Sequence, residues 1–289
     1  PEAPTKKALR PYLKEFLSDP RVIETPKLIW QVILNGVILN TRPAKSAKSY
    51  KSVWTDSGSP LYDIAKKQQA QLAKALPNLV VGLAMRYGNP SIESQLIKMR
   101  DQGVRKILIF PMYPQYCAAT TASTFDKVAQ VLTKWRWIPE VRFINEYYQD
   151  ELYVEALANS IKAFRKEHGT PDLTVFSYHG IPKAYLDKGD PYHCFCHATT
   201  RLVKEHLALT DSDVMTTFQS RFGPAQWLRP YTDEVLKELP GKGIKNIHII
   251  APAFSADCLE TIEEIDQENR EYFMESGGES YNYIPCLND

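Results

Sequence analysis

Residues 214–223 read VMTTFQSRFG and residues 243–252 read GIKNIHIIAP, and this pair of segments decides the fold. The first is a run rich in β-branched residues that leads into an Arg-aromatic-Gly turn. The second is a Gly turn followed by an apolar run that ends at Pro. Strand, turn, helix, turn and strand in this order predict a βαβ crossover between parallel strands.

The same pattern occurs earlier in the chain, where residues 80–88 read VVGLAMRYG and residues 103–111 read GVRKILIFP. Two such units predict an α/β protein with two doubly wound, Rossmann-like parallel-sheet domains. We place the domain boundary at residue 148, which gives halves of 1–148 and 149–289. A ligand is expected in the cleft between the halves, at the carboxyl ends of the strands.

Other elements follow from the spacing of apolar residues. Further strands are predicted at 141–144 and 173–178. Helices are predicted at 5–17, 62–76, 92–102, 123–135, 151–168, 199–209 and 231–239.

Composition excludes several classes of protein. The 289 residues include 35 basic and 34 acidic residues, with a net charge of +1, so no nucleic-acid partner is expected. No apolar stretch reaches 18 residues and no signal peptide opens the sequence, which predicts a cytoplasmic protein. Five cysteines in a chain of this length fit a reducing compartment better than a disulfide framework. No particular oligomeric state is predicted.

Residues 28–39 read LIWQVILNGVIL and form the most apolar stretch of the chain. The stretch is too short to span a bilayer. Its length and periodicity fit a buried core helix, and the alternative is an apolar lip at the rim of a binding site.

Glu260, Glu264 and Glu268 recur at intervals of four residues, so a helix places all three carboxylates on one face. No Lys or Arg lies between Ala251 and Asn269 to offset them, which indicates that this face meets a cation. A solvated acidic helix face is the alternative. The ladder follows the predicted strand at 247–251, where a parallel sheet opens its binding crevice.

His179 ends the strand-like run FSYH and precedes Gly180, which permits a tight turn. An imidazole at that end of a strand points into the crevice and titrates near neutrality. A lone histidine here could be structural, but one beside an acidic ladder favours catalysis. Imidazole and carboxylates together suit a first-row divalent metal, yet the set is too incomplete for a permanent cage. A metal in transit is therefore predicted.

Planar and cationic residues fall near the ends of the other predicted strands and could line a flat apolar slot. They are Arg86, Tyr87, Tyr113, Tyr116, Arg221, Phe222 and Trp227. Arg42, Lys45 and Ser59 could hold the carboxylates of an anionic ligand. Ordinary core aromatics and surface cations are the alternative interpretation of each residue alone.

Five motifs carry a resemblance to a known family, in order along nearly the whole chain. They are YPQY at 113–116, FSYHGIP at 176–182, TFQSRFG at 217–223, WLRPYTD at 227–233 and DCLET at 257–261. Together they resemble the ferrochelatases, class II chelatases that insert ferrous iron into protoporphyrin IX in the terminal step of haem synthesis. The resemblance implies a lyase whose substrates are ferrous iron and a porphyrin, with one chelatase half on each side of residue 148.

The same resemblance implies roles for individual residues. His179 and Glu260 would face each other across the porphyrin, with His179 as acceptor of pyrrole protons or as metal ligand. Glu264 and Glu268 would continue a metal or proton path on a π-helical segment. The porphyrin pocket would include Ser59, Arg86, Tyr87, Tyr113, Ser220 and Trp227. Because protoporphyrin is nearly insoluble in water, we expect residues 28–39 to form its entry lip and to contact the inner face of a membrane.

Two other functions are considered. A cobalt chelatase of an earlier tetrapyrrole shares the fold, although the SYHG motif and the Trp227 segment argue against it. A non-catalytic carrier of metal or tetrapyrrole would need a closed coordination shell and no acidic path beyond it.

The sequence departs from the family pattern in three ways. Pro1 to Pro4 resembles the turn that follows the family's first strand, and the sequence stops at Asp289, before the family's terminal helix. We therefore expect a chain shorter than its relatives. Cys258 stands where some members have a histidine, which weakens a metal role at that position.

The segment HCFCH at 193–197 places two cysteines at Cys-x-Cys spacing, which puts both sulfurs on one side of an extended segment. Some ferrochelatases hold a [2Fe-2S] cluster on four cysteines. Cys117, Cys194, Cys196 and Cys286 would form the set here, and reduced buried thiols are the alternative. Zinc held by these thiolates with His193 or His197 is a further possibility.

Overall fold

The computed structural model describes residues 1–289, which divide into two compact units. The first unit comprises Pro1–Pro111, Cys117–Asn145 and Asp289. The second comprises Met112–Tyr116 and Glu146–Asn288. The short segment Met112–Tyr116, with Tyr113, thus belongs to the second unit although it precedes residue 148.

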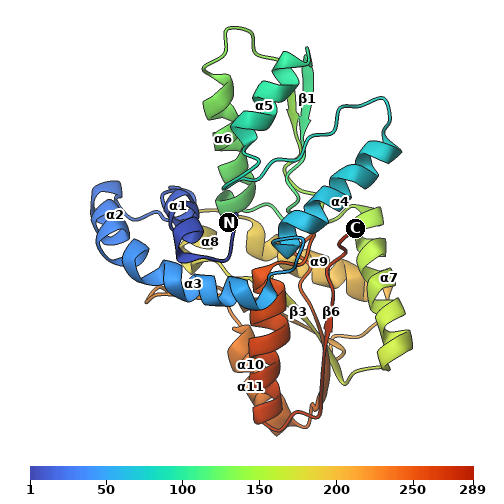
Figure 1. Ribbon diagram of the computed structural model, residues 1–289. Coiled ribbons are helices and arrows are strands. Elements are labelled where there is room, and N and C mark those ends of the chain that lie inside the picture. Colours follow the sequence, from blue (N-terminus) through green and yellow to red (C-terminus); the bar gives the residue numbers. More distant parts are fainter. The chain divides into compact units, whose positions relative to one another are not determined.

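The first unit contains five α-helices before its strands and one between them (Figure 1). Its elements are α1 (Lys6–Leu17), α2 (Lys27–Ile33), the π-helix η1 (Leu34–Ile38), α3 (Leu39–Val53), α4 (Pro60–Ala75), α5 (Ile92–Asp101), β1 (Lys106–Ile109), the π-helix η2 (Ala118–Ala122), α6 (Ser123–Leu132) and β2 (Glu140–Phe143). β1 and β2 pair in parallel, and Ile107 of β1 packs with α5 and α6 around Leu96 and Val131.

The strand predicted at 80–85 is wrong. This stretch forms no ladder, and its one β-bridge joins Met85 to Ser91. The apolar pattern alone does not make a strand, because backbone groups need a hydrogen-bonding strand beside them. Val80 is 57% exposed accordingly.

The second unit is an open sheet of four parallel strands in the order β4-β3-β5-β6. Its elements are α7 (Glu151–His168), β3 (Leu173–His179), α8 (Lys183–Asp187), α9 (Tyr192–His206), β4 (Val214–Gln219), α10 (Thr232–Glu238), the 3₁₀ helix η3 (Pro240–Lys242), β5 (Asn246–Ile250), the π-helix η4 (Glu260–Glu268), α11 (Asn269–Glu275) and β6 (Ser280–Ile284). The polar-apolar pattern of β6 did not predict a strand.

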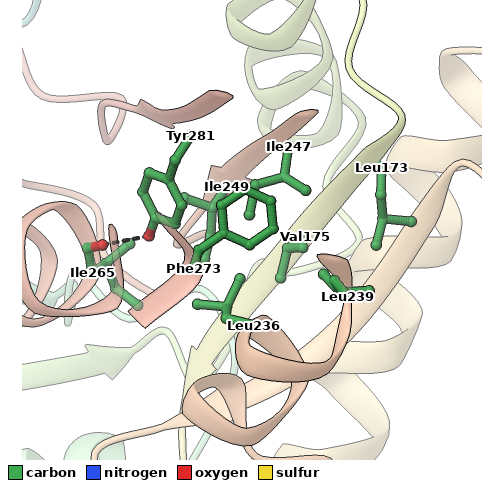
Figure 2. Close-up of a cluster of buried hydrophobic side chains, with 9 residues drawn as sticks. All are labelled: Leu173, Val175, Leu236, Leu239, Ile247, Ile249, Ile265, Phe273 and Tyr281. Carbon is green, nitrogen blue, oxygen red and sulfur yellow. Dashed lines mark hydrogen bonds between the residues drawn. The ribbon is translucent and has the colours of Figure 1, made fainter. Parts of the chain in front are cut away.

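Helices cover both faces of this sheet, with α7 and α9 on one face and α10 and α11 on the other (Figure 1). The α10–α11 face is closed by a cluster of fully buried apolar side chains (Figure 2). Phe273 lies at its centre, and Tyr281 lies beside Ile265, which η4 contributes. Gly278 is required here, because a Cβ at that position would lie 2.2 Å from the Phe273 ring.

Two predicted conformations near the cysteines and the apolar stretch are corrected. The HCFCH segment lies in the first two turns of α9 and is not an extended segment, and α9 starts seven residues before the predicted position 199. Residues 28–39 are helical, but only Leu34 and Leu39 among them are buried. A wholly buried core helix is therefore excluded for this stretch.

Candidate active site

The predicted histidine and acidic ladder both lie at the carboxyl edge of the second unit's sheet. The chain runs from β3 out to β4 and then returns to place β5 on the other side of β3. Ligands of open α/β sheets bind at such a reversal of strand order. His179 ends β3, and η4 begins ten residues after β5 ends, so both flank this point.

Two special backbone positions shape the edge. The Gly180 N–H donates to Gln219 O at 2.8 Å, and a Cβ on Gly180 would lie 2.8 Å from that same oxygen. Only glycine permits so close an approach of the two chains. On the neighbouring strand, Ser220 has a φ of 66°, a left-handed conformation that turns the chain sharply at the end of β4.

A single hydrogen bond sets the tautomer of His179. Its Nδ1 lies 2.7 Å from the carbonyl oxygen of Gly180. A carbonyl oxygen can only accept, so Nδ1 carries the proton and the neutral ring keeps its lone pair on Nε2. The half-buried imidazole therefore offers Nε2 to a proton or a metal ion.

The π-helical form of the ladder segment is confirmed, since η4 covers Glu260–Glu268. Side chains from the sheet engage two of its carbonyl groups. Gln219 Nε2 donates to Glu260 O at 3.2 Å, and the Tyr281 hydroxyl donates to Ile265 O (Figure 2). Side chains that engage helix carbonyls favour departures from the i→i+4 pattern, and such departures are frequent at functional sites.

Among the three glutamates of the ladder, Glu264 makes the most hydrogen bonds with the sheet and has a raised pKa. It accepts hydrogen bonds from the Ser220 N–H at 2.7 Å, the Ser220 hydroxyl and Gln219 Nε2 at 3.3 Å. Burial raises the pKa of Glu264, and Glu260 adds to this, while the Ser220 hydrogen bonds and the His179 charge act in the opposite direction. The carboxyl group thus retains its proton closer to neutrality than an exposed glutamic acid does.

The other two rungs differ from Glu264. Glu260 is partly buried and hydrogen-bonds the Cys258 thiol, whose pKa is raised by burial and by that carboxylate. Glu268 is exposed and accepts a hydrogen bond from the Tyr272 hydroxyl at 2.6 Å, which raises the pKa of Tyr272 to about 12. No three His, Cys, Asp or Glu side chains form a ready-made metal cage.

A polar network behind the edge was not predicted from sequence. Gln219, 3% exposed, accepts from the Ser177 hydroxyl at 2.9 Å while its amide reaches Glu260 and Glu264. Ser177 in turn contacts Thr232 at 2.9 Å. Gln219 is the register partner of His179, so its role was accessible only once the strand pairing was known.

Asp257 anchors the start of η4 and was also missed. This carboxylate is 9% exposed and accepts from Thr261 Oγ1 at 2.9 Å and from the Tyr283 hydroxyl at 2.5 Å. Asn288 closes the set with two hydrogen bonds of 2.8 Å. The network fixes the entry to η4 by joining it to β6 and the residues after it.

Trp227 and Tyr113, both predicted to line the slot, belong to the second unit. Trp227 is 6% exposed, donates its indole N–H to Phe222 O at 3.0 Å and would contact a Cβ at Gly180 at 3.3 Å. The Trp227 side chain therefore packs against Gly180, in the turn that follows His179.

In the first unit, Arg86 and Tyr87 surround the buried carboxylate of Asp19. Arg86 Nη2 pairs with Asp19, and the Tyr87 hydroxyl donates to it at 2.9 Å. Ser123 donates to the same oxygen at 2.5 Å and accepts from Arg86 Nε at 2.6 Å. Such an ion pair is strongly held, because the removal of one partner would leave a buried charge.

Arg42 and Lys45, the other predicted anion-binding residues of the first unit, are three residues apart on α3 and so share a face. Partial burial lowers the pKa of Arg42, and Lys45 is exposed. Ser59 is the residue before α4 and makes no capping hydrogen bond to that helix.

The cysteines do not fit the predicted cluster. Cys194 is exposed and Cys196 is buried, because residues two apart on a helix point in different directions. Cys117 and Cys286 are buried free thiols, and burial raises the pKa of Cys286. The α9 cysteines therefore do not present two sulfurs to one iron pair, and we assign no step to a [2Fe-2S] cluster.

Comparison with known proteins identifies the relatives of the chain. The family profile described as Ferrochelatase matches residues 1–289. Ferrochelatases of Hydrogenovibrio crunogenus and Marinobacter nauticus are 57% and 58% identical, and both alignments cover 100% of this chain and 79% of the relative. Ferrochelatase 2 of Shewanella oneidensis is 53% identical over 100% of this chain and 90% of the relative.

Two solved structures share the fold. "SirB from Bacillus subtilis with Fe3+" has a TM-score of 0.52 and 17% identity, covering 79% of this chain and 85% of that chain. "The structure of CbiX, the terminal Enzyme for Biosynthesis of Siroheme in Denitrifying Bacteria" has a TM-score of 0.53 and 14% identity, covering 80% and 87%. The predicted α/β class with parallel sheets is thereby confirmed.

Proposed function

The chain belongs to the ferrochelatase family, and we propose that ferrous iron is inserted into protoporphyrin IX at the His179 edge of its second unit. The product is haem, and two pyrrole protons leave as the metal arrives. The reaction needs a group that accepts protons near neutrality and anions that lower the cost of bringing a dication out of water.

The observation that carries the assignment is the contact between His179 Nδ1 and the carbonyl oxygen of Gly180, from which the tautomer follows. With Nδ1–H held by Gly180 O at 2.7 Å, Nε2 is the unprotonated nitrogen of the neutral ring. We assign to Nε2 the acceptance of a pyrrole proton. Coordination of the iron by the same atom is the second role that its chemistry allows, since imidazole is a good ligand for first-row metals.

The carboxylates supply the electrostatic part of the proposal. Glu260 and Glu264 are partly buried and would stabilise the incoming dication, because opposite charges interact strongly where water is scarce. The raised pKa of Glu264 also suits it to take up a proton from His179. Glu268, exposed beyond them, would act as the outer end of the path.

Substrate positioning is assigned to the remaining predicted residues. Arg42, Lys45 and Ser59 would hold the anionic groups of the porphyrin, since cations and hydroxyls pair well with carboxylates. Contacts with the porphyrin are also assigned to Arg86 and Tyr87 of the first unit and to Tyr113, Ser220 and Trp227 of the second. Arg86 and Trp227 act through the groups that they fix, Asp19 and the turn after His179.

We also propose that the outer face of α2 and η1 contacts a membrane at its inner surface. Leu28 is 85% exposed and Val32 is 74% exposed, whereas Leu34 on the inner face is fully buried. Trp30 anchors the helix through an indole N–H donated to Leu17 O at 2.5 Å. None of the helices combines the length and apolar character that crossing a bilayer requires. An amphipathic helix lying in the lipid interface would bury this face instead.

Vesicle flotation tests the membrane proposal. The double variant Leu28→Ser and Val32→Ser should lose most of its binding to anionic vesicles and keep its unfolding temperature, because both side chains are already exposed. Leu152→Ser, at a position 75% exposed in the second unit, is the matched control and should bind as the unaltered chain does. Equal binding by all three proteins would remove the proposal.

Anaerobic mixing of the protein with protoporphyrin IX and ferrous iron tests the activity. Catalysed conversion of the free-base absorption bands to those of haem is expected. Bands that shift without turnover would indicate a carrier, and turnover confined to cobalt with an earlier tetrapyrrole would indicate the alternative chelatase.

A further inference from the structure

His193 and His197 form a pair of imidazoles on the first two turns of α9. Residues four apart on a helix lie one above the other on the same face. Their ring centroids are 4.5 Å apart, with an interplanar angle of 50°. His193 is half-buried and His197 is exposed, so the pair opens to solvent.

Phe218 of β4 lies beneath both rings. Its own ring is 1% exposed, stacks on His193 with centroids 5.6 Å apart and lies 6.0 Å from His197. This support limits the rotation of the two imidazoles and so reduces the entropy lost when they bind a common ligand. Neither imidazole makes a hydrogen bond or an ion pair within residues 1–289, so their nitrogens are not committed elsewhere.

The pair does not belong to the proposed catalytic edge. Alternate residues of a strand point to opposite faces of a sheet. Phe218 faces α9, whereas the next residue, Gln219, faces η4 and hydrogen-bonds Glu260 and Glu264. The two histidines therefore lie on the other face of the sheet from Glu264.

Two imidazoles held at this spacing are a chelating unit for a borderline divalent cation of the Zn²⁺, Ni²⁺ or Cu²⁺ class. We propose that His193 and His197 form a surface metal site that binds such an ion through one nitrogen of each ring. Water or a donor group from another molecule completes the coordination, because no third His, Cys, Asp or Glu stands in place. Burial lowers the pKa of both imidazoles, which supports the site because metals bind the neutral ring.

The site differs from the one that the sequence suggested, in which the α9 thiolates were the principal ligands. Cys196 is buried, and the exposed Cys194 completes no group of three His, Cys, Asp or Glu ligands with the two imidazoles. The geometry favours nitrogen ligands alone, and this difference can be measured.

Titration calorimetry with Zn²⁺ alone tests the proposal on the full chain, with thiols kept reduced by a phosphine. The titrations use a background with His179→Ala, Glu260→Gln and Glu264→Gln, which removes the imidazole and the two inner carboxylates of the proposed catalytic edge and keeps the two sites separate. One Zn²⁺ should bind, and His193→Ala or His197→Ala should each weaken it on the order of 10²-fold, the advantage of a second ligand on the same scaffold. Zn²⁺ should also raise the unfolding temperature only where both imidazoles are present, since the unfolded chain does not hold them together.

The controls come from the same helix. His206 is an exposed lone histidine of α9, and His206→Ala should bind Zn²⁺ unchanged. Cys194→Ser should also bind unchanged. Loss of binding in Cys194→Ser with retention in His197→Ala would overturn the proposal in favour of a thiolate site, and unaltered binding in both histidine variants would overturn it outright. His197→Ala is the decisive variant, because this side chain is exposed and lies 6.0 Å from Phe218, whereas His193 is half-buried and stacks on that ring.

Discussion

The second unit carries one histidine at the end of a strand and another in the middle of one, and their surroundings are opposite. His179 ends β3, is half-buried and has its Nδ1–H held by a carbonyl, so that Nε2 is free. His248 lies in the middle of β5, is 2% exposed and has a buried Nδ1 without a partner. Burial, with help from Arg165 and His168, lowers the pKa of His248 to about 4.

The difference shows what an edge position provides. A strand end leaves the side chain accessible and lets the following turn fix its tautomer, whereas a central position removes the ring from water and keeps it neutral. Histidine at the end of β3 is therefore suited to proton transfer, whereas histidine in the middle of the neighbouring strand β5 lowers the stability of the fold in acid.

Replacement of His179 tests whether the histidine at the strand end is catalytic, and it should have the largest effect on turnover. We expect His179→Ala to lower iron insertion on the order of 10²-fold or more, the usual scale for loss of a proton-transfer group. Glu260→Gln should act on the same scale. Turnover at saturating iron and porphyrin is the measurement, and porphyrin binding followed by fluorescence should persist in both variants. Near-normal turnover of His179→Ala would shift both roles to the carboxylates.

Replacement of His248 tests whether the buried histidine makes stability depend on pH. The folded-state pKa of about 4 lies below the ordinary value of 6.5, so the unfolded chain binds a proton that the folded chain refuses between these values. Stability should fall as the pH drops from 6.5 to 4, by about 3 kcal/mol at 1.36 kcal/mol for each pH unit. His248→Leu should flatten this part of the profile in urea unfolding, while its turnover stays normal. An unchanged slope would show that other groups cause the acid sensitivity.

Glu264 combines features of the two histidines, since it is partly buried and lies at the edge of the sheet. Its folded-state pKa is raised from 4.5, so burial of the charged form costs stability that grows as pH rises from 4.5 and is complete above the folded-state pKa. Glu264→Gln should therefore be more stable than the unaltered chain at pH 8, on the order of 1 kcal/mol, with the gain lost at pH 4. Unfolding midpoints at the two pH values provide the measurement. A gain independent of pH would assign the effect to packing.

The sequence predicted those parts of the site that depend on local motifs. His179 before Gly180, the spacing of Glu260 and Glu264, and most helices are written in short segments, and the structure contains them. Gln219 was missed because its contacts with the ladder depend on the strand order β4-β3-β5, which brings together residues 40 and more positions apart.

The errors have physical causes of the same kind. The HCFCH segment, expected to be extended, is helical because Phe218 and the rest of the sheet provide a surface on which a helix packs. The apolar run at Val80 has no strand beside it, and β6 is a short element with polar Ser280 and Asn282 that pairing with β5 alone makes regular. In each of these segments, contacts with residues far away in the sequence determine the secondary structure.

Glu268 is expected to have the smallest effect, because it continues the ladder of Glu264 but is exposed to water. It is exposed, and its carboxylate is held by the Tyr272 hydroxyl at 2.6 Å. A charge exposed to water contributes little to the electric field inside the site, because solvent and salt screen it. Water can also take the place of an exposed carboxylate in a proton relay. Glu268→Gln should therefore lower turnover only a few-fold, with a loss that shrinks as ionic strength rises, and Tyr272→Phe should mimic part of it by freeing the carboxylate. A loss as large as that of Glu260→Gln would place the rate-limiting capture of iron at the exposed end of η4.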